Sequence, residues 1–344
     1  MANFLEQLPK HLQEIAERVN VRTPEAILTT PKVKFLDTRL CALDTCVHSC
    51  TPEDVRILKD AAAKWLAETP ASADSLFRPP ASLKWSRLTF GCASLDRCTG
   101  GGIVTRGITE ICGISGSGKT QLLLQLSLGV QLPSRLGGLG KGVAFICTED
   151  MFPSRRLLQI CKAFEARYPE EQLNFLGNIF IEHQYESKPL LNCVHNRLPQ
   201  LLQEHSIGLI IIDSVAAIFR LYTDFAERAR DMRRLVNALL TYADKYQCAV
   251  VCTNQMTASL NADQQASHDV PCLGLQWANL GRTRMRISKV PKQHKVADKL
   301  LTVRKLEIIY SPETPNAFAE FLITSEGVVD VPTMPQPMPR SKQL

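Results

Sequence analysis

A glycine-rich octapeptide between an apolar run and a helical run limits this chain to few folds. It consists of Gly113, Ile114, Ser115, Gly116, Ser117, Gly118, Lys119 and Thr120, and it fits the pattern GxxxxGK[ST] of a phosphate-binding P-loop. Glycine lets the backbone turn tightly enough for several N–H groups to face one phosphate chain, and the N-terminus of a following helix adds a favourable dipole. A Gly/Ser-rich turn that ends in Lys-Thr by chance is the alternative, and the flanking runs argue against it. An α/β fold that binds a nucleotide is therefore expected.

The last residues of this motif and a later apolar strand have separate expected tasks. Lys119 should reach the β- and γ-phosphates of ATP, and the Thr120 hydroxyl should ligate Mg²⁺. The apolar run at residues 209–212 ends in Asp213, the form of a Walker B strand whose carboxylate holds Mg²⁺ through water. ATP and Mg²⁺ are therefore the expected ligands.

Hydrolysis would also need a base that orients and deprotonates water. Open α/β sheets present their ligands at the carboxyl ends of strands, and Glu149 stands at the end of the apolar run 143–148. Glu149 is therefore the candidate general base. The adjacent Asp150 is the alternative, but it is better suited to an N-cap or turn before Pro153.

The pattern divides the chain into a small helical domain over residues 1–68, a linker over 69–84, an α/β core over 85–330 and a flexible tail over 331–344. Helical periods cover residues 8–19, 24–28, 34–47 and 52–67, and the linker is rich in Pro, Ala and Ser. In the core, apolar runs at 107–112, 143–148, 179–182, 209–213 and 249–253 alternate with helical periods. This alternation favours a mostly parallel sheet flanked by helices. After Gly281 the runs 283–288, 301–310 and 317–324 lack intervening helices and predict a β-hairpin extension.

Composition argues against membrane-spanning, exported and disulfide-rich proteins. Hydrophobic residues make up 45% of the chain, but no uninterrupted apolar stretch reaches the roughly 18 residues of a membrane span. The N-terminus carries acidic residues, which a signal or transit peptide lacks. The 12 cysteines lie in apolar runs without a CxxC pair, so we expect them to be reduced and buried. The spacing of Cys41, Cys46, His48 and Cys50 matches no common zinc pattern, which favours packing over a metal site.

A basic segment follows the parallel core, although the net charge is only +6. In a strand, Arg282, Arg284 and Arg286 would share one face and present three guanidiniums, while their apolar neighbours pack on the other. Such a row predicts contact with DNA phosphates without sequence preference. The alternatives are a solvated hairpin face, or pairing with acids or ATP phosphates of a partner subunit.

The motifs stand in an order that resembles the eukaryotic RecA-like recombinases of homologous recombination. The resemblance rests on the P-loop, Thr148-Glu149, the strand before Asp213 and the run from Val251 to Gln255, and it covers about residues 1–330. Among family members, several segments look most like one DNA-repair paralogue. These segments are 118–122, 131–133, 137–139, 147–150, 213–217 and 273–279.

This resemblance implies a RecA-type core with a helix-hairpin-helix-like N-terminal domain, and roles for single residues. Glu149 corresponds to the family's catalytic glutamate and Gln255 to its sensor of the γ-phosphate, at the start of the second DNA loop. Arg156 matches an arginine that packs near the adenine, and Gln121 belongs to the same pocket. The implied protein is a slow DNA-dependent ATPase, nuclear with a cytoplasmic pool. It would be a mediator that works with a sister paralogue in a hetero-oligomer, and with the main recombinase filament, on single-stranded or branched DNA.

The sequence also departs from the family pattern. The first DNA loop, residues 219–231, is shorter and lacks glycines, and the second loop, residues 256–272, has its own sequence. Tyr310 precedes Ser311-Pro312 where filament formers have Asp, and Phe77 and Ala81 are one residue too far apart for a Phe-x-x-Ala motif. We therefore expect a different subunit interface and no strand pairing by this chain alone. The other readings are an ATP-gated structural subunit without hydrolysis of its own and a RecA-fold motor, the latter without a further helicase signature.

Overall fold

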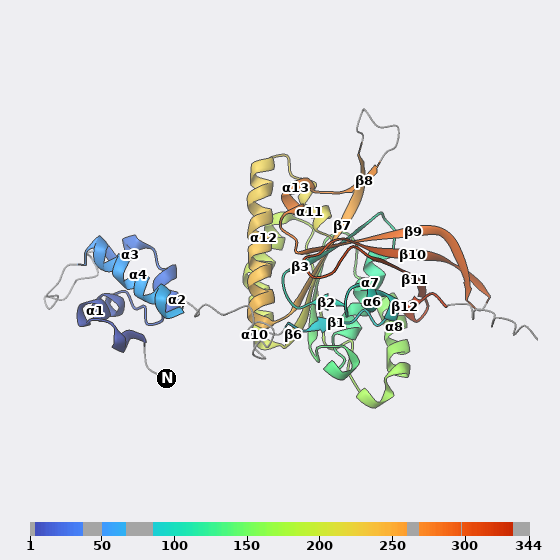
Figure 1. Ribbon diagram of the computed structural model, residues 1–344, viewed down its shortest axis with the longest axis horizontal. Coiled ribbons are helices and arrows are strands. Elements are labelled where there is room, and N and C mark those ends of the chain that lie inside the picture. The colour runs from blue at the N-terminus through green and yellow to red at the C-terminus, as the bar shows by residue number, and fades with distance from the viewer. Residues whose placement is uncertain (1–3, 37–49, 67–84, 260–267, 297, 333–344) are drawn as a thin grey trace, which may run out of the picture. The chain divides into compact units, whose positions relative to one another are not determined.

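The computed structural model describes residues 4–36, 50–66, 85–259, 268–296 and 298–332, which belong to two units, residues 1–83 and 84–344 (Figure 1). The N-terminal unit is helical. Its elements are η1 Phe4–Gln7, α1 Lys10–Arg18, α2 Pro24–Thr29, α3 Lys32–Leu36 and α4 Pro52–Leu66.

Sequence signals explain these helices. Helix α2 has Thr23 as N-cap, which accepts a hydrogen bond from the Ala26 N–H at 3.2 Å, and proline follows at the first helical position. Apolar residues spaced three or four apart meet in one core, which includes Leu12, Ile27 and Leu58. The helix expected over residues 34–47 is described only as α3, since residues 37–49 lie outside the described ranges. Cys41, Cys46 and His48 lie there too, and Cys50 is half-buried.

The second unit is built on a ten-stranded sheet in the order β12-β11-β10-β9-β3-β7-β6-β4-β5, with β8 paired to β7. The strands from β9 to β5 pair in parallel, and β9 to β12 form an antiparallel extension. The predicted fold class, a RecA-type core with a C-terminal hairpin extension and N-terminal helices, is confirmed. The strands are β3 Ile108–Gly113, β4 Gly142–Cys147, β5 Ile179–His183, β6 Ile207–Asp213, β7 Ala249–Ser259, β8 His268–Pro271, β9 Thr283–Val296, β10 Lys299–Tyr310, β11 Phe318–Thr324 and β12 Gly327–Asp330.

Helices cover both faces of the sheet (Figure 1). They are α7 Lys119–Gly129, α8 Ser154–Arg167, α9 Ser187–Asn192, the π-helical turn η6 Cys193–Arg197, α10 Leu198–Glu204, α11 Val215–Phe219, α12 Phe225–Tyr246 and α13 Gly274–Ala278. The smaller elements are α6 Ala93–Cys98, η4 Ser134–Leu136, η5 Pro169–Glu171 and the strand pair β1 Arg87–Leu88 with β2 Ile103–Val104.

Two hydrophobic cores, one on each face, fix the register of the central strands. Val143 and Phe145 of β4 belong to the core that contains residues of α7 and α8. Ala144 and Ile146 belong to the core that contains residues of α10 and α12. Because a slip of one residue would exchange the two faces, the strand ends are held at defined positions. The functional side chains at those ends are placed accordingly.

Strands β7, β9 and β10 are longer than their sequence pattern indicated. Strand β9 continues to Val296, and β7 continues to Ser259 to pair with β8. The last residues of β9 are mostly exposed or half-exposed, so no buried alternation marks them, and backbone pairing with β10 holds them instead. Among the described residues, no helix is both long and apolar enough to cross a membrane.

Candidate nucleotide-binding site

The octapeptide connects β3 to α7 and requires glycine at two of its positions. Gly118 has φ of +114°, in the region that L side chains rarely adopt. A Cβ at Gly113 would lie 2.5 Å from the Ile287 carbonyl oxygen of the neighbouring strand. Glycine at these positions therefore lets the loop turn tightly against the neighbouring strands, and a turn of this kind can cradle a phosphate chain.

The Lys119 ammonium is held inside this loop. Its Nζ donates to the carbonyl oxygens of Gly113 at 2.7 Å and of Ile114 at 3.1 Å. Burial lowers the pKa of Lys119, and the charges of Asp213 and Glu149 oppose this shift. A cation in such partly dry surroundings interacts strongly with an anion that enters the loop.

Three side chains from different elements converge behind the loop. The Thr120 hydroxyl donates to Asp213 Oδ2 at 2.8 Å, and the Thr253 hydroxyl of β7 donates to the other oxygen, Oδ1. Hydroxyl and carboxylate oxygens are the ligands that Mg²⁺ prefers, so the donor set fits this cation. Thr253 was missed in the sequence, since only the register Ile212 to Cys252 between β6 and β7 brings it beside Asp213.

Glu149, the predicted base, and Gln255, the implied sensor of the γ-phosphate, are in direct contact. Gln255 Nε2 donates to Glu149 Oε1, and the Ser214 hydroxyl donates to Glu149 Oε2 at 3.4 Å. Arg220, which sequence reasoning missed, donates to Gln255 Oε1 at 2.8 Å and lies 3.7 Å from Glu149 Oε1. A proton acceptor and its polar neighbours thus lie together at the carboxyl ends of β4, β6 and β7.

A pocket of about 280 Å³ opens onto these groups, and Thr120, Glu149 and Asp213 all line it. Asp150 lines it as well and is exposed. Of the two expectations for Asp150, the N-cap is wrong, because α8 begins at Ser154 after Pro153 without a side-chain cap. Asp150 instead lies in a bend before Pro153.

Gln121 and Arg156, expected in one pocket, are hydrogen-bonded to each other. Arg156 Nε donates to Gln121 Oε1 at 2.6 Å, and its terminal nitrogens donate to the carbonyl oxygens of Thr324 at 2.6 Å and Ser325 at 3.0 Å. Burial lowers the pKa of Arg156. The pair thereby ties the first turn of α7 to α8 and to the turn between β11 and β12.

Two cations of the C-terminal extension also approach the P-loop, and the sequence did not reveal this. Arg304 Nε donates to the Ser117 carbonyl oxygen at 2.9 Å. A Cβ at Gly116 would lie 3.6 Å from Lys289 Nζ. Because Arg304 and Lys289 are partners in the β10–β9 register, the hairpin extension places both beside the loop.

The expected row of three presented guanidiniums is wrong. Arg284 Nε donates to Glu110 Oε2 at 2.6 Å, Arg286 to Glu307 at 2.6 Å and Arg282 to Glu313 at 2.7 Å. The sheet register causes the first two pairs, since Glu110 stands opposite Arg284 and Glu307 opposite Arg286. Each arginine is therefore neutralised by a carboxylate of its own chain, and contact of these residues with DNA stays a prediction.

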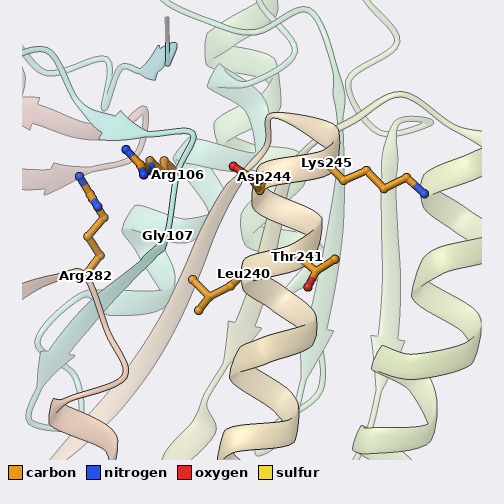
Figure 2. A pocket seen from close by; sticks show the side chains of 7 residues that line it. All are labelled: Arg106, Gly107, Leu240, Thr241, Asp244, Lys245 and Arg282. Atoms are coloured by element: carbon orange, nitrogen blue, oxygen red, sulfur yellow. The ribbon is translucent and has the colours of Figure 1, made fainter. Parts of the chain in front are cut away.

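A further pocket of about 570 Å³ lies away from this site (Figure 2). Its lining includes Arg106 and Gly107 before β3, Arg282 before β9, and Asp244 and Lys245 of α12. Because the P-loop follows β3 whereas Gly107 precedes it, the pocket lies at the opposite end of that strand. Lys245 also points away from both arginines (Figure 2). We assign this pocket no part in the nucleotide site.

Comparison with known proteins agrees with the geometry. A family model described as Rad51 matches residues 83–331. The DNA repair protein XRCC3 of Bos taurus is 38% identical and covers 72% of this chain and 75% of its own length. XRCC3 of Mus musculus is 34% identical, with 81% and 86% covered, and the XRCC3 homolog of Arabidopsis thaliana is 32% identical, with 71% and 93% covered. The DNA-repair paralogue that the sequence segments indicated is XRCC3, so that prediction is confirmed.

Proposed function

Because this chain belongs to the Rad51 family of RecA-like ATPases, we propose that it is an ATP-binding paralogue that acts in the repair of DNA double-strand breaks by homologous recombination. The observation that carries this proposal is the convergence of Thr120, Asp213, Glu149 and Gln255 behind an intact P-loop. Its similarity to proteins named for DNA repair supports the process. It would work in the nucleus, with a cytoplasmic pool.

The nucleotide would be held by the chain's own groups in the loop. The bare backbone of residues 113–118 and the Lys119 ammonium bind the phosphates, while Gln121 and Arg156 form the adenine side of the pocket. Thr120 and Asp213 hold Mg²⁺, which when bound neutralises charge on the phosphates.

Glu149 would be the base of a slow, DNA-dependent hydrolysis. The oxygen of a water molecule bonds to the γ-phosphorus as the bond from that phosphorus to the bridging oxygen breaks, and the water's proton passes to Glu149. Gln255 is well placed to sense the γ-phosphate, since it contacts Glu149 and lies at the start of the segment 256–272.

DNA contact would use the segments that follow the carboxyl ends of the sheet, together with exposed cations of the extension. Arg282 and Arg286 keep N–H donors beyond their ion pairs, and their side chains are 30% and 39% exposed. The Arg284 side chain is only 16% exposed, so its contribution to DNA contact is smaller. Trp277 is fully buried, which leaves charge rather than base stacking as the main attraction.

A sister paralogue would complete the working complex, a mediator that acts with the main recombinase filament on single-stranded or branched DNA. Strand β5 ends the sheet on one side, and free edge strands accept strands of partners. Ile181 of β5 is 41% exposed beside an apolar pocket of about 380 Å³ that Leu198 and Leu201 also line. This edge is the partner surface that we favour.

The test separates nucleotide binding from turnover in the assembled complex. Lys119→Ala should abolish tight ATP binding, because a charge-assisted contact in a partly dry site is lost. Glu149→Gln should bind ATP normally and lose hydrolysis, since the amide cannot accept a proton.

The matched control is Asp150→Asn, which removes the neighbouring carboxylate and should keep turnover. Hydrolysis by Glu149→Gln at the wild-type rate would place the base elsewhere. Equal ATP affinity in wild type and Lys119→Ala would refute the P-loop assignment. If ATP strengthens the complex but even wild type does not hydrolyse it, the chain is an ATP-gated structural subunit.

A further inference from the structure

Arg220 lies where the candidate base and a surface segment meet. It follows α11 directly, and its side chain is 50% exposed. One terminal nitrogen donates to Gln255 Oε1 at 2.8 Å, and the other lies 3.7 Å from Glu149 Oε1. Gln255 Nε2 donates to that same carboxylate oxygen. The guanidinium thus contacts both residues proposed for the hydrolytic step.

These contacts restrain Glu149 as a proton acceptor. Its Oε1 faces Gln255 and the Arg220 cation, and its Oε2 accepts from the Ser214 hydroxyl at 3.4 Å. An oxygen that already accepts from an amide and faces a guanidinium has less room to accept a hydrogen bond from an attacking water. Glu149 Oε1 becomes free to orient that water when Arg220 leaves.

Arginine keeps its charge at any pH that a protein tolerates, so a competing anion rather than loss of a proton would draw Arg220 from its partners. Such an anion can approach from solvent, because half of the side chain is exposed. The planar guanidinium is matched best by an anionic group with two acceptor oxygens, since such a group can accept two parallel hydrogen bonds. A phosphodiester backbone has this form.

The surface around Arg220 is suited to such a backbone. The segment 220–234 carries the bases Arg220, Arg228, Arg230, Arg233 and Arg234 and the acids Asp224, Glu227 and Asp231. Two of the acids are engaged within the chain. Asp224 accepts from the Ala226 N–H at 2.7 Å as the cap of α12, and Asp231 accepts from Tyr222 Oη at 2.7 Å. Arg220 and Arg234 also pair within the chain, with Glu149 and Asp231, and Arg228, Arg230 and Arg233 still outnumber the remaining acids of the segment.

We propose that Arg220 is a positioning residue that couples a nucleic-acid backbone to the candidate base. Phosphate oxygens take over the Arg220 guanidinium, Gln255 loses one partner, and Glu149 is released to accept the proton of water. The inference rests on the proposed function, because it takes Glu149 as the base. It assigns the DNA dependence of hydrolysis to the contact of Arg220 with Gln255 and Glu149.

Arg220→Gln in the full chain, assembled with its partner, tests the coupling with two independent readouts. ATP hydrolysis without DNA should rise by about fivefold or more, the low end of typical couplings between sites, and added single-stranded DNA should stimulate it little further. Binding of fluorescent single-stranded DNA across a salt series should lose about 0.7 from its logarithmic slope, the amount for one phosphate contact. The affinity for ATP should stay at the wild-type value.

Two control variants bracket this result. Arg220→Lys keeps the charge but loses the planar fork, so it should be stimulated less than wild type and more than Arg220→Gln. Arg135→Gln breaks another ion pair with an exposed arginine, that with Glu171, and should match wild type in both readouts.

The outcomes separate the two proposals. A fall in DNA-independent hydrolysis in Arg220→Gln would mean that Arg220 assists the chemistry, and unchanged stimulation would mean that it plays no part in coupling. Stimulation of wild type by polyglutamate as strongly as by DNA would assign the surface to an acidic protein.

If wild type and Glu149→Gln hydrolyse ATP equally, the proposed function fails and the coupling with it. If only Glu149→Gln is inactive while Arg220→Gln behaves as wild type, the coupling alone is refuted.

Discussion

Replacing Arg284 by Gln should destabilise the core far more than it weakens DNA binding. Arg284 Nε donates to Glu110 at 2.6 Å, and the two side chains are 16% and 1% exposed. The only other hydrogen bond recorded to this carboxylate among the described residues comes from Asn254 Nδ2, at 2.7 Å. The substitution therefore leaves a buried negative charge with one neutral partner.

The expected loss of stability follows from the burial of the Glu110 carboxylate. Breaking a buried ion pair by removing one partner costs about 3–5 kcal/mol, because the remaining charge is uncompensated. For a unit of this size each kcal/mol corresponds to roughly 2–4 °C in the unfolding midpoint. The midpoint of the core should therefore fall by about 6–20 °C. Arg282→Gln is the matched control, since its pair with Glu313 is 30% and 21% exposed and such pairs contribute only about 0–1 kcal/mol.

Thermal unfolding of the full chain, followed by near-ultraviolet circular dichroism, measures the difference. The double variant Glu110→Gln with Arg284→Gln should recover much of the lost stability, because the buried charge is gone. DNA affinity, measured well below both midpoints, should change little in Arg284→Gln. Equal midpoints for Arg284→Gln and Arg282→Gln, with DNA binding lost only in the former, would refute the structural reading and return Arg284 to the DNA surface.

The domain division and the hairpin's approach to the P-loop give two further expectations. Removing residues 1–70 should leave a soluble core that binds ATP, because a Pro-rich linker implies few contacts across the boundary. A fluorescent-nucleotide assay measures this binding. An insoluble product, or one that binds no nucleotide, would show that the boundary is wrong. Arg304→Gln removes the hydrogen bond to the Ser117 carbonyl oxygen. ATP binding should weaken by about tenfold, the effect of one hydrogen bond from a charged donor, with little change in the melting temperature. Unaltered ATP affinity in titration calorimetry would exclude a role for Arg304 in holding the loop.

The parts of the site that sequence predicted are those with local signals. The glycines, Lys119 and Thr120 are contiguous, and Asp213 follows an uninterrupted apolar strand whose two faces are both buried. Glu149 was found in the same way, from its position after β4. In each case the residue type and its place after a strand were enough, because parallel strands bring their carboxyl ends to one edge.

The residues that sequence missed depend on pairings between distant segments. Arg220 belongs to the site only because β7 brings Gln255 beside it. Arg304 belongs to it only because β10 brings its guanidinium to the Ser117 carbonyl oxygen. The three arginines of the basic segment looked alike in sequence, yet the register pairs one of them with Glu110, 174 residues away. Strand alternation predicts which side chains share a face, but it says nothing of the charges on the neighbouring strands.

The architecture lets this chain depart from its family in loops while it keeps the nucleotide site. Asp213 and Gln255 stand on strands, and Glu149 directly follows one, whose register is held by two buried cores, so a change in a surface segment moves them little. Arg220 lies between α11 and α12, and Gln255 lies in β7 directly before residue 256. The segments 219–231 and 256–272 therefore adjoin these two residues. Their length and charge can therefore change the nucleic acid or partner that is bound, while the contact between Arg220, Gln255 and Glu149 still reports the occupancy of those segments to the base.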